Sequence, residues 1–107
     1  GMTQRLPRRV GLLKAKELMF SGRVVGGEEA VQIGLANQCV PDPSLLDSGL
    51  EMAISFLENS WFTLRADKML INGGLDYTLH EGLIWERENS PGRGPDVSAR
   101  MANFGKT

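Results

Sequence analysis

The feature that most restricts the fold of this sequence is an apolar stripe that follows Ser44. Its members, in order, are Leu46, Leu50, Ala53 and Leu57. Steps of three and four residues place side chains on one face of an α-helix, whereas a half-buried strand needs strict alternation. The spacing therefore predicts an amphipathic helix over residues 44–57.

Helix start and stop signals recur along the rest of the chain. Thr3 is placed to cap a first helix, Thr78 and Glu81 have the spacing of a capping box, and Asp96 precedes a last apolar segment. Gly22, Gly34 and the pair Gly73-Gly74 follow helical segments and are expected to end them. The sequence predicts a mainly α chain of about six short helices, with one short extended piece at residues 35–41 and no parallel sheet.

Composition excludes several classes of protein. The 107 residues carry 12 Lys and Arg against 13 Asp and Glu, a net charge of −1, without the basic excess of a dedicated nucleic-acid binder. Cys39 is the single cysteine, which excludes an internal disulfide and fits a reducing, cytoplasmic location. With one histidine besides, a conventional zinc site is not expected. No apolar run approaches the roughly 20 residues of a bilayer span, so no membrane contact is expected.

Few residues are candidates for chemistry. The adjacent acids Glu28 and Glu29 point about 100° apart on a helix, so we interpret them as solvated acids of a first helical turn. His80 follows the capping residue Thr78 closely and is interpreted as a surface residue. Cys39 lies in an apolar stretch and is expected to be a buried, inert thiol. Residue types alone therefore assign no catalytic residue and no metal ligand.

The beginning of the chain is basic. The first sixteen residues contain five basic side chains and no acid: Arg5, Arg8, Arg9, Lys14 and Lys16. They form either a solvated helix face or a phosphate-binding or nucleic-acid-binding patch, and no aromatic residue alternates with them as single-strand binding requires. A nucleic-acid-binding helical domain is thus the weakest of the functional interpretations.

The order of several short motifs resembles the crotonase, or enoyl-CoA hydratase/isomerase, superfamily. TQRLPR from Thr3, followed by Val10-Gly11, is similar to the family's G-T-Q-R-L-P-R-x-V-G, and ELMFSGR from Glu17 to its E-L-x-x-T/S-G-R. Further matches are Glu28-Glu29-Ala30, the Gly34–Asn37 stretch, the Leu75–Leu83 stretch and the terminal pattern of Met101, Ala102 and Phe104. The matches run in family order along essentially the whole chain.

This resemblance implies that residues 1–107 are the C-terminal helical, oligomerisation domain of a crotonase-like protein. In the family, the catalytic glutamates and the oxyanion-hole donors belong to an N-terminal spiral ββα domain, whose motifs this sequence lacks. The resemblance therefore implies a fragment of an enzyme of fatty-acid metabolism that is itself non-catalytic. It needs no cofactor, since the coenzyme A thioester is the substrate of the parent protein.

The resemblance also implies two residues that bind substrate. In the family, an aromatic residue and a lysine near the C-terminus contact the coenzyme A of a neighbouring subunit. Phe104 matches the aromatic residue, while Lys106 lies close to the family lysine but out of register. The family's D-A-R-E-G segment is replaced by SPGRGPDVSAR from Ser90. The expected partner is another copy of the chain, and the alternative function is a stand-alone helical self-association module.

Overall fold

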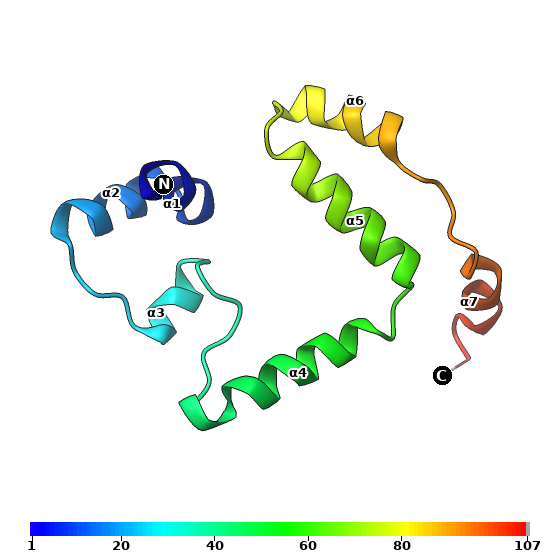
Figure 1. Ribbon diagram of the computed structural model, residues 1–107, viewed down its shortest axis with the longest axis horizontal. Helices are drawn as coiled ribbons and strands as arrows, with labels where there is room; N and C mark the ends of the chain where they lie inside the picture. The colour runs from blue at the N-terminus through cyan, green and yellow to red at the C-terminus, as the bar shows by residue number, and fades with distance from the viewer. Residues whose placement is uncertain (107) are drawn as a thin grey trace. The chain divides into compact units, whose positions relative to one another are not determined.

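The computed structural model describes residues 1–106, and these residues are mainly α-helical (Figure 1). Its elements, in chain order, are α1 (Met2–Val10), α2 (Leu12–Ser21), α3 (Gly27–Gln32), the 3-10 turn η1 (Asp42–Ser44), α4 (Leu45–Phe56), α5 (Trp61–Gly74), α6 (Leu79–Asn89) and α7 (Val97–Asn103). The predicted fold class is confirmed, with seven α-helices rather than about six. The expected extended piece at 35–41 forms neither helix nor strand, and no strand occurs within the described residues.

The chain divides into two compact units, Gly1–Gly49 and the part that begins at Leu50, and α4 crosses the boundary. In the first unit, α1 packs against α2. Leu6, Ala15 and Leu18 form the buried core of this contact, and Val10, Val25 and Ile33 pack around them. Ala15 is the most enclosed of the three, at 1% exposure. A small residue at this point allows the two short helices to approach closely.

The first helix begins earlier than predicted. Thr3 lies within α1 and is not its cap; Gly1 occupies the N-cap position, and its carbonyl accepts from the amides of Gln4 and Arg5. Pro7 lies inside α1, and its carbonyl accepts the hydrogen bond from the Gly11 amide that closes the helix. A helix can begin on a backbone carbonyl alone, so Thr3, two residues after Gly1, is not required as a cap.

Glycines at two positions end helices as predicted. Gly22 follows α2 with a φ of 64°, and its amide donates to the Leu18 carbonyl. After α3, Gly34 has a φ of 80° and donates to the Val31 carbonyl, while the amide of Leu35 donates to the carbonyl of Ala30. This second pattern is a Schellman motif, which needs a left-handed residue that glycine adopts without steric penalty.

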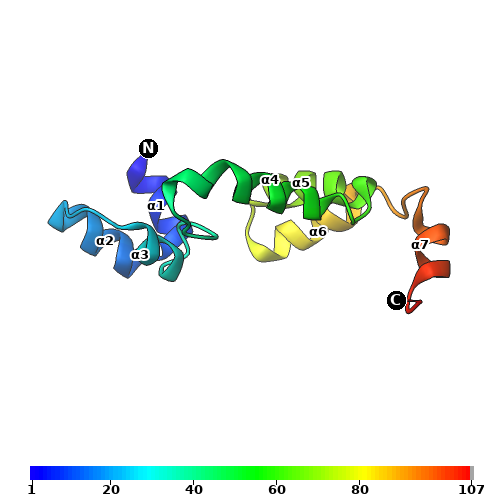
Figure 2. The same ribbon diagram turned by 90° about the horizontal axis from the view of Figure 1, so that it is seen from below.

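In the second unit, α5 and α6 are joined by a short turn and contact each other, forming a helical hairpin whose two arms diverge away from the turn (Figures 1 and 2). Thr78 begins α6 with the predicted capping box: the amide of Glu81 donates to Thr78 Oγ1 at 3.3 Å, and the amide of Thr78 donates to Glu81 Oε2 at 3.1 Å. Gly73 and Gly74 were expected to follow the end of a helix, but α5 continues through both of them.

Gly73 has a packing role that explains this difference. A Cβ atom built on Gly73 would lie 2.5 Å from Trp85 Cζ2 and closer still to Cη2, so the indole of α6 occupies the space of the missing side chain. Trp85 also lies beside Tyr77, with ring centroids 6.2 Å apart. The glycine therefore belongs to the helix–helix contact and not only to the helix end.

The apolar stripe that predicted the helix over 44–57 is exposed; Leu46, Leu50 and Ala53 lie on α4, and Leu57 follows its last residue, Phe56. Leu46, Leu50 and Leu57 all expose more than half of their accessible surface, and the α-helix itself begins at Leu45, after Ser44 completes η1. Leu13 and Phe20 on α2 are exposed as well, at 86% and 83%. Within the described residues, no helix has the length and apolar character of a membrane-crossing segment.

Candidate functional site

The adjacent acids of α3 have different environments. Both lie in the first turn of α3, as predicted; Glu28 is exposed, whereas Glu29 is half-buried and ion-paired with Arg23. Arg23 Nη1 donates to Glu29 Oε2 at 2.8 Å and Nη2 to Oε1 at 2.5 Å. The same guanidinium donates from Nε to Glu17 Oε1 at 2.7 Å and from Nη2 to Oε2 at 3.1 Å. One arginine thus bridges the end of α2 and the start of α3.

The electrostatics of this cluster oppose a catalytic role. Hydrogen bonds from Arg23 lower the pKa of Glu17 and of Glu29, while Glu29 and Glu17 together raise the pKa of Arg23. A carboxylate whose pKa is lowered is a weak base and is not a proton donor near neutral pH. The cluster of Glu17, Arg23 and Glu29 is therefore a structural clamp between two helices.

Neither His80 nor Cys39 lies in a chemically active arrangement. His80 is the second residue of α6 and is exposed, as predicted. Cys39 is also exposed, so the expectation of a buried thiol was wrong. The segment around it forms no strand that another element covers, although the thiol lies against Gly27, where an added Cβ would be 2.5 Å from Sγ. Within residues 1–106, no three His, Cys, Asp or Glu side chains gather as a metal site would require.

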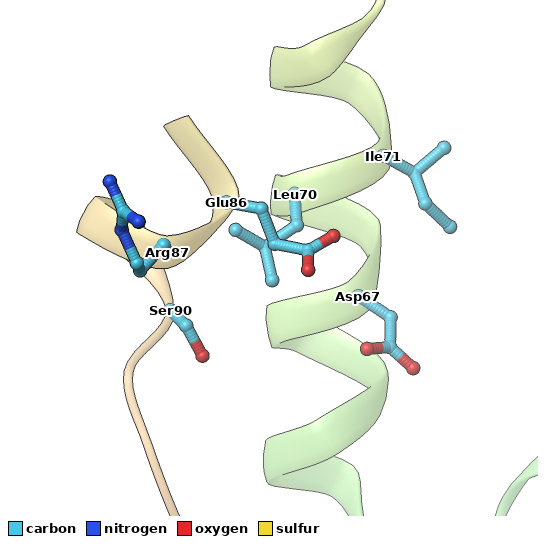
Figure 3. Close-up of a pocket in the computed structure, with 6 residues that line it drawn as sticks. All are labelled: Asp67, Leu70, Ile71, Glu86, Arg87 and Ser90. Atoms are coloured by element: carbon cyan, nitrogen blue, oxygen red, sulfur yellow. The ribbon is translucent and has the colours of Figure 1, made fainter. Parts of the chain in front are cut away.

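Two shallow grooves line the helical hairpin. One, of about 410 Å³, lies between α5 and the end of α6 (Figure 3), where Glu86 extends toward α5 beside Leu70. The other, of about 430 Å³, is mostly apolar and is lined by Trp61, Phe62, Arg65, Ala66, Met69 and Pro91. Neither lining brings together a nucleophile, a base and donors for an oxyanion, which acyl-CoA chemistry requires.

The most developed polar network in the second unit surrounds Asp96. Ser60 Oγ donates to Asp96 Oδ1 at 2.8 Å, Arg100 Nε donates to Asp96 Oδ2 at 2.5 Å, and Arg100 Nη1 donates to the Glu58 carbonyl at 2.8 Å. Hydrogen bonds from Arg100, and secondly from Ser60, lower the pKa of Asp96. Asp96 occupies the predicted N-cap position of α7, but its side chain makes no capping bond. Its carboxylate instead accepts hydrogen bonds from Ser60 and Arg100, and no local sequence signal predicts these contacts.

The two predicted substrate-binding residues lie at the end of α7. Phe104 is the C-cap residue and is 90% exposed. Lys106 is also exposed, and its amide donates to the carbonyl of Asn103 at 3.2 Å. Both side chains are exposed to solvent within the described residues, so their predicted role concerns a surface and not an enclosed pocket.

The basic residues of the first two helices are mostly solvent-exposed. Arg5, Arg9 and Lys16 are exposed. Arg8 Nη1 donates to the Gln4 carbonyl at 3.0 Å, and Lys14 lies 3.9 Å from a carboxylate oxygen of Glu17. Two of the five are thus engaged with neighbours on their own helices, as on an ordinary solvated helix face.

Comparison with known proteins identifies the family. Residues 1–91 match the family model described as enoyl-CoA hydratase/isomerase. The chain is 39% identical over 90 residues to the mitochondrial methylglutaconyl-CoA hydratase of Rattus norvegicus, covering 80% of this chain and 29% of that protein. It is 34% identical over 88 residues to the short-chain-enoyl-CoA hydratase of Clostridium acetobutylicum, covering 82% and 34%. The chain belongs to the enoyl-CoA hydratase/isomerase family, as its motifs predicted.

The solved structures agree in fold. The crystal structure of an enoyl-CoA hydratase from Bacillus anthracis superposes with a TM-score of 0.85 at 32% identity, over 99% of this chain and 42% of that one. An enoyl-CoA hydratase from Geobacillus kaustophilus superposes with a TM-score of 0.83 at 30% identity and the same coverage. The chain therefore spans less than half the length of each of the four relatives named here and corresponds to a helical part of the two solved structures.

Proposed function

We propose that these residues form the C-terminal helical, assembly-forming part of an acyl-CoA-processing enzyme and supply no acid–base catalysis themselves. The observation that carries the proposal is the 42% of an enoyl-CoA hydratase chain that the helices match, together with the absence of converging catalytic groups among residues 1–106. Acyl-CoA thioesters are proposed as the substrate class because the matching relatives are named for them.

The chemistry of hydration explains the second half of this proposal. Addition of water to an enoyl thioester requires a base for the water, an acid for the α-carbon and donors for the enolate oxygen. Glu29 is held by Arg23, and Glu28 and His80 are exposed on different helices. These positions give no geometry in which two titratable groups face one substrate.

The test is a crotonyl-CoA hydration assay on the purified 107-residue chain. We expect the loss of enoyl absorbance to equal the uncatalysed rate at every protein concentration. A rate that rises in proportion to protein and falls in Glu28→Gln or His80→Ala would contradict the proposal. Loss of the same rate on further purification, with both variants unaffected, would identify a contaminating hydratase and leave the expected result in place.

The assembly function rests on the exposed apolar side chains. Leu13 and Phe20 on α2 and the stripe on α4 face solvent, and apolar patches beyond a few hundred Å² are unusual on soluble monomers. Burying about 400 Å² would contribute roughly 10 kcal/mol, against association costs of about 4–15 kcal/mol. The two terms are of similar size, so self-association requires burial of more than about 400 Å² of apolar surface where the cost lies at the upper end of its range. Such an assembly would also serve the alternative function of a stand-alone helical module.

Light scattering at tens of micromolar tests this function. We expect an oligomer that dissociates in Leu13→Asp or Phe20→Asp with unchanged helicity, while Lys16→Asp on the same helix leaves the mass unchanged. A strictly monomeric wild-type chain would exclude self-association. The proposed contact of Phe104 and Lys106 with coenzyme A belongs to the assembled enzyme and rests on the family resemblance.

A further inference from the structure

The start of α7 is tied to the junction between α4 and α5 by the two longest-range side-chain hydrogen bonds found in the described residues. Ser60 reaches Asp96 across 36 residues, and Arg100 reaches the Glu58 carbonyl across 42. The third bond, from Arg100 to Asp96, joins these two into one network. We call these four groups, the Glu58 carbonyl and the side chains of Ser60, Asp96 and Arg100, the α7 clasp.

Two features of the clasp are typical of a specific contact: Ser60 is buried, and its hydroxyl has defined hydrogen-bond partners. Ser60 is the one buried polar residue of the described chain, at 8% exposure. Its hydroxyl accepts from the Thr63 amide at 3.4 Å while it donates to Asp96, so it acts at once as an acceptor and as a donor. A bidentate carboxylate between a hydroxyl and a guanidinium is also more directional than a single ion pair.

The backbone is fitted to the same contact. A Cβ built on Gly94 would lie 2.9 Å from Asp96 Oδ1 and 2.9 Å from Phe62 Cδ1. The loop before α7 therefore passes α5 at a distance that only glycine permits. Glycine at this position allows Asp96 to reach Ser60.

Apolar packing contributes little to the position of α7. No residue of α7 is buried, and Met101 and Phe104 are exposed at 69% and 90%. A seven-residue helix is not stable by itself in water, so contacts outside the helix must hold it. Among the contacts described, those of the clasp are the polar ones that reach another element.

We propose that the clasp is a positioning device: Ser60, Asp96 and Arg100 seat α7 on the α4–α5 junction and thereby fix the segment that carries Phe104. The part of this inference that concerns coenzyme A rests on the proposed function, because Phe104 is the residue assigned there to the nucleotide. The seating of α7 itself does not depend on that assignment.

Amide hydrogen exchange on the full 107-residue chain tests the seating. In Asp96→Ala we expect the amides of Arg100 and Phe104 to exchange at least tenfold faster, with the amides of α6 unchanged. Asp96→Asn, which keeps both the shape and an acceptor, should recover part of the protection. Glu58→Gln is the matched control, since only the carbonyl of Glu58 takes part, and it should leave exchange unchanged.

A second variant separates the clasp from helix capping. Ser60→Gly keeps an acceptable N-cap for α5 but removes the donor to Asp96, so it should accelerate exchange in α7 and not in α5. Unchanged α7 exchange in both Asp96→Ala and Ser60→Gly would overturn the proposal. Equal acceleration across α5, α6 and α7 would also overturn it, because it would show a global loss of stability.

The coenzyme A arm uses the assembled enzyme that contains these residues. We expect Asp96→Ala and Phe104→Ala to raise KM for acyl-CoA by similar factors with little change in kcat, and Glu58→Gln to change neither. Faster α7 exchange with an unchanged KM in both variants would refute the coenzyme A role of Phe104 and retain the clasp. A raised KM in Phe104→Ala alone would refute positioning through the clasp.

Discussion

Replacing Gly73 by alanine tests the packing of the α5–α6 hairpin more sharply than any other single change. The new Cβ would lie 2.5 Å from Trp85 Cζ2 and 3.0 Å from Cζ3, whereas carbon atoms in good contact are about 3.5–4.0 Å apart. The indole must therefore move by about 1 Å or more. Such overpacking costs about 1–3 kcal/mol.

Gly74 supplies a matched control in the next position of the same helix. A Cβ at Gly74 meets nothing within 4 Å, so Gly74→Ala gains only helix propensity, up to about 1 kcal/mol. Gly73→Ala gains the same propensity but loses the contact. We therefore expect Gly73→Ala to be less stable than Gly74→Ala by about 1–3 kcal/mol.

Thermal unfolding followed by far-UV circular dichroism measures this difference. For a domain of this size, 1 kcal/mol corresponds to about 4–8 °C in Tm, so the two variants should differ by at least about 4 °C. Trp85→Leu, which replaces the indole by a smaller aliphatic side chain, should abolish the difference when combined with each alanine. Equal Tm values for Gly73→Ala and Gly74→Ala in the wild-type background would refute the reasoning.

Three further changes test local features. Gly34→Ala should destabilise the chain by about 1–2 kcal/mol because the residue has a φ of 80°, whereas Gly26→Ala, which meets nothing within 4 Å, should be less harmful; chemical denaturation compares them. Thr78→Ala should cost about 1 kcal/mol through loss of the α6 cap, measured in the same way. Arg23 lowers the pKa of Glu29 from 4.5, so their pairing stabilises the fold above pH 4.5, and this contribution is lost as the pH falls below that value. Arg23→Gln should therefore reduce the change in the free energy of unfolding between pH 6 and 3, measured by chemical denaturation at each pH.

Several elements could be predicted from the sequence because their stabilising contacts are local. The capping box of Thr78 and Glu81 and the stop at Gly34 each depend on backbone groups within one helical turn. The spacing of three residues between a cap and its acid, or the position of a glycine after a helix, is visible in a linear sequence. The local signals do not show which fold the helices belong to, and the order of the family motifs along the chain supplies that information.

The contacts that could not be predicted join residues without a characteristic spacing. Gly73 meets Trp85 across the α5–α6 turn, and the sequence presents that glycine only as a helix stop. Ser60 meets Asp96 over 36 residues, and in the sequence each is only a residue type that is common at helix N-termini. Cys39 lies in an apolar stretch, but a segment becomes buried only when another element covers it.

Few apolar side chains of these helices are buried, although the helices are amphipathic. The described residues bury only Leu6, Ala15 and Leu18 among their apolar side chains, although the stripe on α4 has the spacing of core-facing residues. Amphipathic helices of 7–14 residues gain most of their stability from a surface that covers the apolar face. The helix caps, the Arg23 clamp and the α7 clasp stabilise local conformations of the helices and their ends. The exposed stripe on α4 contacts no complementary apolar surface within the described residues. In the proposed function, further enzyme residues or a second copy of the chain would supply that surface, and the helical periodicity would then serve an interface as well as a fold.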